Sequence, residues 1–536
     1  MNNKPLLALM LFLGFSLVQL EQVAAQERKA FGPYSLYLEQ ARNEQILGIT
    51  DSTGALTITT PQSSSTLKKE GFQVLPLVLL QQYNSFAPYG WNDGLLIPAK
   101  GYQAYMNAGF KLQHRRWQVQ INPEAVYASN PAFERFPTTE TDDIRLAYAN
   151  YLNYSDLPDR FGRGSFQKAT WGQSYLKYTA DKWSFGIANE NMWWGPGYRN
   201  ALLMSTSAPG FWHLSLQTSR PLKTKLGSIE TKMIAGRLEG SNWATNPEAF
   251  EVNGQNESIA KSADWRYLSG LSISYQPKWI PGLYLGLNRV FQIYRNDLGS
   301  GLTDYLPFIT PFQKKGVPGE DAKKRDQLAS VYFRWVLPES KTEIYGEYGW
   351  NDHKQNVWDL AGSPSHAAAF LIGMRKLFPV QGSKDKYLRL NLEITQLQQS
   401  ADRLVRPAGA WYMHGSIRHG YTHQGQVLGA GIGPGSNSQT LDIAFWNKNQ
   451  VFGFQLERYA HNLDFFYDAY TQVMVDYNRK WTDIMLNTYT YRQWGQIGLR
   501  AALNAAWIRN YQWQENRNPL NMQVQFGLNY RFSKQN

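Results

Sequence analysis

The C-terminal stretch Met522-Gln-Val-Gln-Phe-Gly-Leu-Asn-Tyr-Arg-Phe532 alternates apolar and polar residues over its whole length. Successive side chains of a β-strand point to opposite faces, so one face of this segment is apolar and the other is largely polar. The segment is longer than the five or six residues of an ordinary strand, and it matches the length that a tilted strand needs to cross a bilayer. The stretch therefore predicts a membrane-spanning strand with one face toward lipid and the other toward a lumen.

The same alternation recurs upstream. Polar segments rich in Gly and Pro, such as 296–301, 313–325 and 431–438, interrupt it at unequal intervals, as short turns on one side of a membrane and long loops on the other would. No comparable helical periodicity stands out after residue 72. We therefore predict an all-β fold, a large antiparallel transmembrane β-barrel over residues 71–536. The other predicted strand regions are 110–121, a hairpin turning at His114-Arg115-Arg116, and 343–350, 388–394 and 452–457.

The N-terminus predicts export. Lys4 gives a positively charged start, residues 5–20 are almost wholly apolar, and Val23-Ala24-Ala25 supplies the small residues that a signal peptidase requires. We predict a signal peptide over residues 1–25. Residues 26–70 would then form a small N-terminal periplasmic region, with a short helix within 27–43 and an extended stretch within 46–60.

Composition narrows the function classes. The chain has no cysteine, which excludes disulfides, thiol chemistry and cysteine-ligated zinc sites. Aromatic residues reach 14%, with 19 Trp and 32 Tyr, and such side chains suit membrane interfaces and sugar binding. The net charge of +12 favours anionic partners such as outer-membrane lipid phosphates or acidic polysaccharide. No nucleic-acid recognition motif is present, and no cofactor is predicted.

The densest aromatic motif is Trp193-Trp194-Gly195-Pro196-Gly197. Indole faces can stack on the apolar faces of sugar rings while neighbouring polar groups bind the hydroxyls. Those groups would come from Glu190, Asn191, Arg199 and Asn200. The alternative is that both tryptophans belong to an interfacial girdle or brace a loop inside the barrel.

Carboxylates and histidines form two further groups. On a strand, Glu343 and Glu347 share a face about 7 Å apart by strand rise, and Asp352 follows in sequence. Such a pair could serve glycoside hydrolysis, but ordinary lumen polarity balanced by basic residues explains it better. His414, His419 and His423 resemble metal ligands, yet the odd spacing of the first two would place them on opposite strand faces. We favour loop structure or sugar hydrogen bonding for them and predict no metal site and no catalytic residue.

Several segments lie in order along the chain: 191–200, 205–209, 226–241, 344–352, 418–423 and 425–436. Together they resemble the Wzi family of capsule assembly proteins. The resemblance implies an outer-membrane barrel of about 18 strands that behaves as a lectin and helps attach exported polysaccharide to the cell surface. Enterobacterial members carry a periplasmic helical bundle, which residues 27–70 do not clearly encode.

We therefore expect a non-catalytic protein that binds capsular polysaccharide or exopolysaccharide, with polysaccharide export machinery as a further partner. The alternatives are a porin or uptake channel for small solutes, which ion conductance would reveal, and an outer-membrane hydrolase of lipid or glycan. The predicted polysaccharide-binding residues are Asn191, Trp193, Trp194, Arg199, Glu347, Asp352, His419 and His423.

Overall fold

The computed structural model describes residues 36–50, 54–59, 70–243, 250–309, 324–351, 361–383, 385–404, 408–447, 449–472 and 475–532. The predicted signal peptide, the first part of the predicted N-terminal helix and Asp352 lie outside these residues. None of the described helices is long and apolar enough to cross a membrane.

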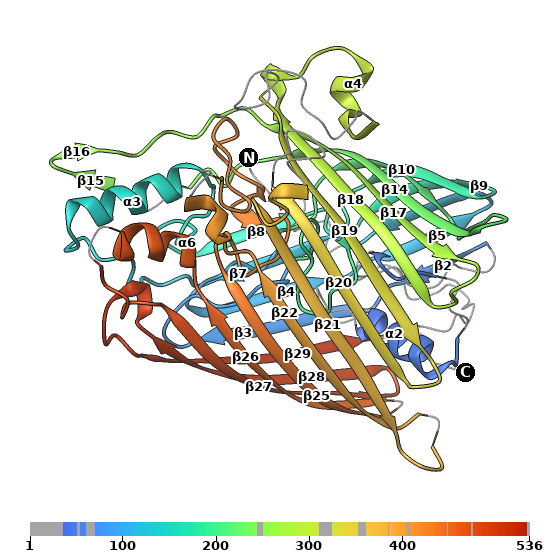
Figure 1. Ribbon diagram of the computed structural model, residues 1–536. Helices are drawn as coiled ribbons and strands as arrows, with labels where there is room; N and C mark the ends of the chain where they lie inside the picture. Colours follow the sequence, from blue (N-terminus) through green and yellow to red (C-terminus); the bar gives the residue numbers. More distant parts are fainter. Residues whose placement is uncertain are drawn as a thin grey trace.

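The described strands form a closed antiparallel barrel (Figure 1). The ring contains 23 strand segments. Five of the barrel's strands are each broken into two segments, so the barrel has 18 strands, which we call staves. The single-strand staves are β10 (Trp183–Ala188), β14 (Gly227–Leu238), β17 (Arg266–Pro277), β18 (Leu283–Tyr294), β19 (Asp326–Leu337), β20 (Thr342–Asn351), β21 (Ala368–Pro379), β22 (Tyr387–Gln396), β25 (Asn437–Asn447), β26 (Gln450–Ala460), β27 (Thr482–Trp494), β28 (Ile497–Arg509) and β29 (Leu520–Tyr530). The broken staves are β2 (Gly71–Val74) with β3 (Leu77–Asn84), β4 (Gly101–Asn107) with β5 (Phe110–His114), β6 (Trp117–Ile121) with β7 (Glu124–Ala128), β8 (Phe166–Thr170) with β9 (Tyr175–Ala180), and β12 (His213–Thr218) with β13 (Leu222–Lys223).

The C-terminal strand closes the ring. β29 pairs with β28 on one side and with β3 on the other. Val524 and Phe526 are each 49% exposed on the outer face, whereas Gln523 and Gln525 are buried on the inner face. The predicted all-β barrel of about 18 strands is confirmed, because apolar side chains point outward and polar ones inward, as the alternation requires.

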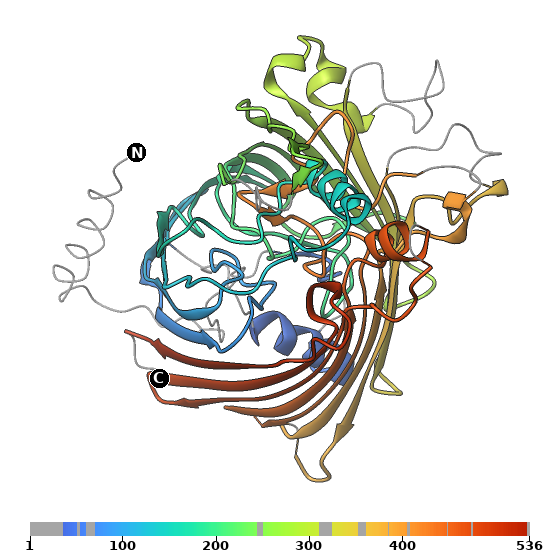
Figure 2. The same cartoon turned by 90° about the vertical axis from the view of Figure 1, so that its left-hand side faces the viewer.

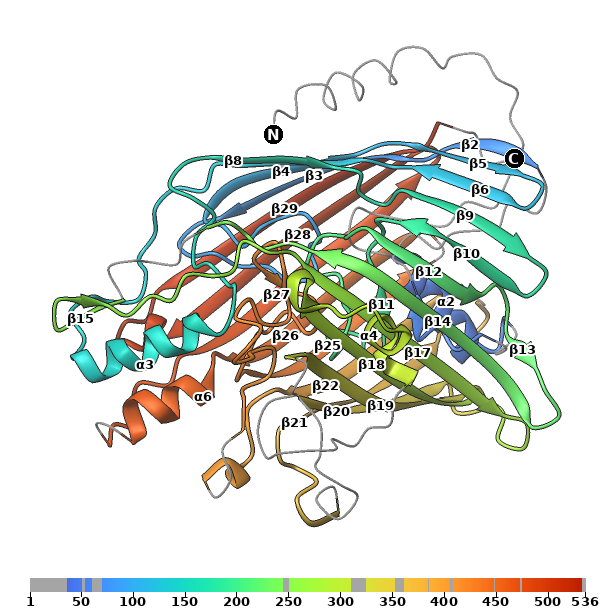
Figure 3. The same ribbon diagram turned by 90° about the horizontal axis from the view of Figure 1, so that it is seen from above.

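The two ends of the barrel differ. Consecutive staves are joined by short turns at one end and by long connections at the other. The helices α3 (Asp142–Asn153) and α6 (Leu463–Phe466) lie together beyond the long-connection end (Figure 3). Small elements of the long connections are β11 (Trp193–Trp194), β15 (Glu251–Val252), β16 (Gln255–Asn256), β23 (Thr422–His423), β24 (Gln426–Val427), η2 (Arg295–Asp297), α4 (Leu302–Tyr305), η3 (Pro307–Ile309), η4 (Ala401–Leu404), η5 (Tyr467–Thr471) and η6 (Tyr511–Trp513).

Helix α3 shows that the expectation of no helix after residue 72 was wrong. Asp142 and Asp143 stand in its first turn, where the helix dipole favours negative charge. Its buried residues include Ile144, Tyr148 and Leu152, which recur every four positions along one helix face. That stripe packs on aromatic residues of the 460–482 connection, and it is short enough to be overlooked among alternating strands.

The N-terminal region enters the barrel. Helix α2 (Leu36–Leu47) lies inside the ring toward the short-turn end (Figure 2), so the predicted helix forms but extends past residue 43. Arg42 pairs with Glu343 of β20 at 2.5 Å and donates to the carbonyls of Pro196 and Gly197. The Glu39 carboxylate forms an ion pair with the guanidinium of Arg389 on β22 at 2.8 Å. Among the described residues of the predicted extended stretch, only β1 (Ile58–Thr59) is a strand.

The Arg42–Glu343 contact generates a prediction for the variant Arg42→Met. Methionine keeps the length of the side chain but removes the ion pair and two hydrogen bonds, which costs about 3 kcal/mol for a buried charge pair. We expect a lower melting temperature and a rise in ion conductance across planar bilayers, because α2 is no longer held in the lumen.

The matched control is Arg220→Met. Arg220 and Asp181 form an ion pair whose side chains are 62% and 72% exposed, and such surface pairs contribute little. Equal conductance in the two variants would show that the ion pair does not retain the helix.

Candidate functional site

The connection between β10 and β12, residues 189–212, folds into the lumen rather than outward. Its strand β11 pairs with β1 of the N-terminal region. Gly195 has a φ of +125°, a conformation that favours glycine, and an added Cβ would lie 2.7 Å from a carboxylate oxygen of Glu347. The Trp-Trp-Gly-Pro-Gly motif therefore forms a tight turn against the barrel wall.

Inward-facing carboxylates of the strands hold this connection. Glu393 of β22 accepts the backbone N–H groups of Tyr198, Arg199 and Asn200 at 2.6 to 3.2 Å. Arg199 also makes a two-bonded ion pair with Glu457 of β26, at 3.1 and 3.0 Å. Buried backbone N–H groups need partners, and here the barrel wall supplies them.

Glu347 belongs to the same set of anchors. It accepts a hydrogen bond from the Ser330 hydroxyl at 2.6 Å and from the backbone N–H of Leu202 at 3.2 Å. Glu343 and Glu347 both face the lumen and are buried, as the alternation predicts. Arginines neutralise Glu343, and N–H and O–H donors satisfy Glu347, so lumen packing accounts for the pair.

Glu190 anchors the first residues of the connection. Burial alone would raise the pKa of its carboxyl, but Lys177 and Lys232, at 2.6 and 3.5 Å, hold that pKa at about 2. The carboxylate is therefore charged at neutral pH and ties the connection to strands β9 and β14.

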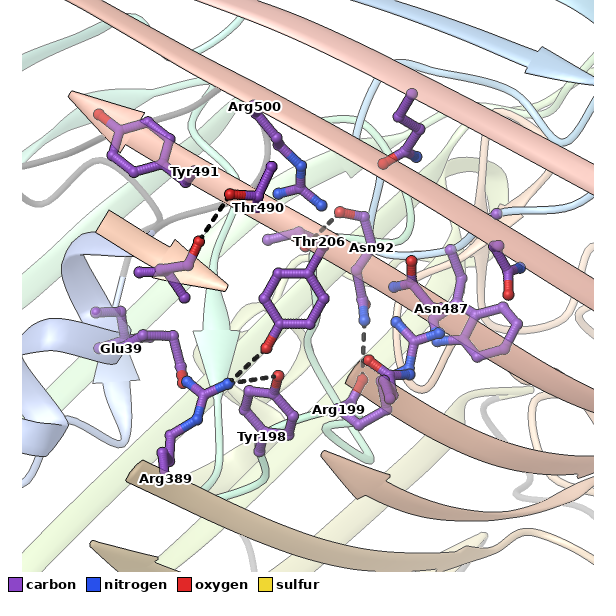
Figure 4. A pocket seen from close by; sticks show the side chains of 18 of the residues that line it. Glu39, Asn92, Tyr198, Arg199, Thr206, Arg389, Asn487, Thr490, Tyr491 and Arg500 are labelled. Carbon is purple, nitrogen blue, oxygen red and sulfur yellow. Dashed lines mark hydrogen bonds and ion pairs between the residues drawn. The ribbon is translucent and has the colours of Figure 1, made fainter. Parts of the chain in front are cut away.

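Four of the predicted sugar-binding residues, Asn191, Trp193, Trp194 and Arg199, lie in this connection with different surroundings. Asn191 exchanges hydrogen bonds with Gln173, and Trp194 is fully buried against the wall. The alternative that these residues brace a loop inside the barrel describes both of them. Trp193 and Arg199 line a lumenal cavity, and Figure 4 shows Arg199 at that cavity. Contact with polysaccharide stays a prediction for all of them, and Trp193 and Arg199 are the pair that face open space.

The histidines lie in the 396–437 connection. His419 Nδ1 contacts the Tyr294 hydroxyl at 2.9 Å, and His423 Nδ1 accepts the backbone N–H of Glu239 at 3.1 Å. Burial lowers the pKa of both rings, that of His419 to about 3, with a further contribution from Arg266. Both rings are therefore neutral at physiological pH and are in contact with nearby groups, and sugar contact stays a prediction for His419 and His423. Across the described part of the chain, no three metal-binding side chains converge.

A second candidate site lies at the long-connection end. Two adjoining cavities of about 260 Å³ each share Trp91, Tyr459, His461 and Trp481. The His461 ring stacks on Trp481 at 3.7 Å and 9° and lies 3.8 Å from the ring of Tyr459. Asp483 accepts the Trp481 indole N–H at 3.0 Å and contacts His461 Nε2 at 2.8 Å. We call these rings, Tyr459, His461 and Trp481, the outer aromatic stack.

Sequence reasoning missed the outer aromatic stack. Tyr459 lies near the end of β26, and His461 and Trp481 lie in the connection that follows it. Their neighbours Trp91 and Trp513 come from two other connections, so no local motif links the five rings. The available signal was the surplus of Trp and Tyr in polar connections, which does not identify which rings meet.

Comparisons with known proteins agree with the fold. The Wzi protein of Escherichia coli, described as a carbohydrate-binding β-barrel of the outer membrane involved in group 1 capsule assembly, has a TM-score of 0.57 at 14% identity, over 86% of this chain and 85% of that one. The Acinetobacter baumannii protein OccAB1 has a TM-score of 0.40 at 8% identity, over 89% of this chain and 100% of that one, too low to carry an argument. No curated protein matches the sequence significantly. The model of the capsule assembly protein Wzi family matches residues 98–519, most of the chain, and the protein is therefore a member of the Wzi family and an outer-membrane β-barrel.

Proposed function

We propose that this protein binds capsular polysaccharide or exopolysaccharide at the cell surface without catalysing a reaction, and that it attaches and organises the polymer there. The observation that carries the proposal is the outer aromatic stack, which lies in a pocket at the long-connection end of a barrel of this family. We take that end to face the cell exterior, because outer-membrane barrels place their short turns in the periplasm. The E. coli relative is itself described as carbohydrate-binding.

The chemistry of the pocket suits a sugar. Ring faces pack against the apolar C–H faces of pyranose rings, and polar groups beside them bind hydroxyls. Asn462 and Ser436 line the same cavity and supply such groups. Each contact is weak, but one polymer engages many barrels, so the total attachment gains by multivalency.

The apolar belt of the barrel supports outer-membrane lipid as a second partner. On β26, Phe452, Phe454 and Leu456 are 41 to 48% exposed on the outer face, while Gln455 and Glu457 face inward. Residues 1–25 as signal peptide and 26–70 as a periplasmic region remain part of the proposal.

The porin alternative is less favoured. Helix α2, residues 189–212 and the 396–437 connection place their buried side chains inside the ring, so these segments occupy the path that a solute would take. A hydrolase is less favoured because the partners of Glu343 and Glu347 are structural.

The variant Trp481→Ala tests the proposal. Cells that lack the gene are expected to make undiminished total polymer but to shed it into the medium. Wild-type protein restores retention, whereas Trp481→Ala restores little of it and binds purified polymer at least about tenfold more weakly, a loss of about 1.4 kcal/mol. Trp481→Phe keeps a ring and gives an intermediate result.

The control is Trp279→Ala, because Trp279 is an exposed tryptophan at a short turn of the opposite end. All variants are checked for barrel folding by heat-modifiable migration in gels. Unchanged polymer partition in the deletion strain would contradict the proposal, as would equal binding by the two alanine variants.

The buried carboxyl of Asp464, in α6, predicts a pH dependence. Burial raises the pKa of Asp464 to about 7, although the backbone N–H of Gln399 and the Arg403 guanidinium oppose this rise. In the unfolded loop the carboxyl ionises at about pH 4. Because its pKa is higher in the folded loop, the stability of the folded loop falls as pH rises from about 4 to 7 and then levels off. Asn462, which caps α6, lines the outer cavity, so polymer capture should weaken between about pH 5 and pH 8.

The variant Asp464→Asn keeps the acceptor for Gln399 but cannot ionise. We expect its capture of the same polymer to be flat over this pH range, with the wild-type protein as reference. Parallel pH profiles of the two proteins would assign the dependence to the polymer or to another group.

A further inference from the structure

A separate cavity of about 210 Å³ lies within the lumen, and Figure 4 shows side chains that line it. Helix α2, the 189–212 connection and strands β26 to β29 form its walls. It shares Gly90 and Trp91 with the outer cavities, so the segment 89–92 separates the two spaces.

One wall carries a row of side-chain amides. Gln455 of β26 lies opposite Asn487 of β27, Asn487 opposite Asn504 of β28, and Asn504 opposite Gln523 of β29. Directly opposed residues on antiparallel strands place their Cβ atoms about 5 Å apart. All four side chains line the cavity and form a continuous band of donors and acceptors across four strands, which we call the amide row.

The two ends of the amide row are engaged. Gln455 Nε2 donates to Glu457 at 3.2 Å, and Gln523 Nε2 donates to the carbonyl of Tyr89 at 3.2 Å. The two central members differ from them. Asn504 is only 4% exposed, and neither its Oδ1 nor its Nδ2 meets a hydrogen-bond partner among the described residues. Asn487 Oδ1 likewise has no hydrogen-bond partner among the described residues.

Burying amide groups without partners is costly, because their hydrogen bonds to water are lost and not replaced. Asparagine beside asparagine at the centre of a barrel wall is therefore a poor choice for stability alone. A leucine at either position would fill similar space without that cost. The arrangement is better suited to a ligand that brings its own donors and acceptors in a closely spaced row.

The residues on the other walls of the cavity narrow the chemical class of that ligand. Trp193, Tyr198 and Tyr489 contribute aromatic side chains, and Arg389 and Arg500 contribute guanidinium groups. A purely apolar ligand would leave the amide row without partners. A ring with an apolar face and several hydroxyls at its edge satisfies both kinds of wall, because each hydroxyl both donates and accepts.

We propose that the lumenal cavity holds a single sugar ring, with its hydroxyls on Asn487 and Asn504 and its C–H face toward the aromatic wall. The site is distinct from the outer aromatic stack, and the proposal does not depend on polymer capture there.

The test uses the full-length folded protein in detergent and isothermal titration calorimetry. The probes are the methyl glycosides of glucose, galactose and mannose, together with D-glucuronate. We expect at least one of these rings to bind with a stoichiometry of one. The variant Asn504→Leu should weaken that binding at least tenfold, while its melting temperature without sugar is equal to or above that of the wild-type protein.

The variant Asn487→Leu serves as a second probe if Asn504→Leu does not fold. Trp481→Ala is expected to keep ring binding, and Asn504→Leu is expected to keep polymer capture, so failure at one site is distinguishable from failure at the other. The proposal is overturned if no probe gives heat above buffer, which means that the cavity holds water alone. It is also overturned if ring binding is lost in Trp481→Ala and kept in the leucine variants.

Discussion

The interior of this barrel depends on a few carboxylates that face the lumen. Glu343 and Glu347 on β20, Glu393 on β22 and Glu457 on β26 are all at most 3% exposed. A buried carboxylate is tolerated only when positive or hydrogen-bonding groups surround it. Each of these four receives such groups from segments that enter the lumen: the Arg42 guanidinium of α2, and the N–H groups and the Arg199 side chain of residues 189–212. The charged wall and the segments inside it therefore stabilise one another.

This dependence explains which parts of the structure could be predicted from the sequence. The alternation of apolar and polar residues is a local property with a period of two, so it predicted the strands, the inward face shared by Glu343 and Glu347, and the pairing of 110–114 with 117–121. It could not predict what the carboxylates bind. Leu202 is 145 residues from Glu347, and Arg42 is 301 residues from Glu343. Contacts over such separations leave no periodic mark on one sequence.

The aromatic residues also show that the sequence does not predict which side chains meet in the folded chain. Trp193 and Trp194 stand out because they are adjacent, yet Trp194 is fully buried and only its neighbour lines a cavity. The members of the outer aromatic stack are not adjacent in sequence, and the pairing of β26 with β27 brings Tyr459 and His461 beside Trp481. The local density of aromatic residues therefore pointed to Trp193 and Trp194, whereas the pairing of β26 with β27 forms the outer aromatic stack.

The lumenal cavity and the outer pocket share the aromatic residue Trp91. Arg199, fixed by Glu457, stacks over the ring of Trp91 at 4.1 Å, and Tyr459 of the outer aromatic stack contacts Trp91 edge to face at 5.4 Å. The charged wall thus holds the floor of the outer pocket through two rigid contacts. A binding surface made only of loops loses conformational entropy each time it meets a ligand, and a surface supported from below loses less. Such preorganisation supports the proposed attachment, in which many weak sugar contacts together retain a polymer.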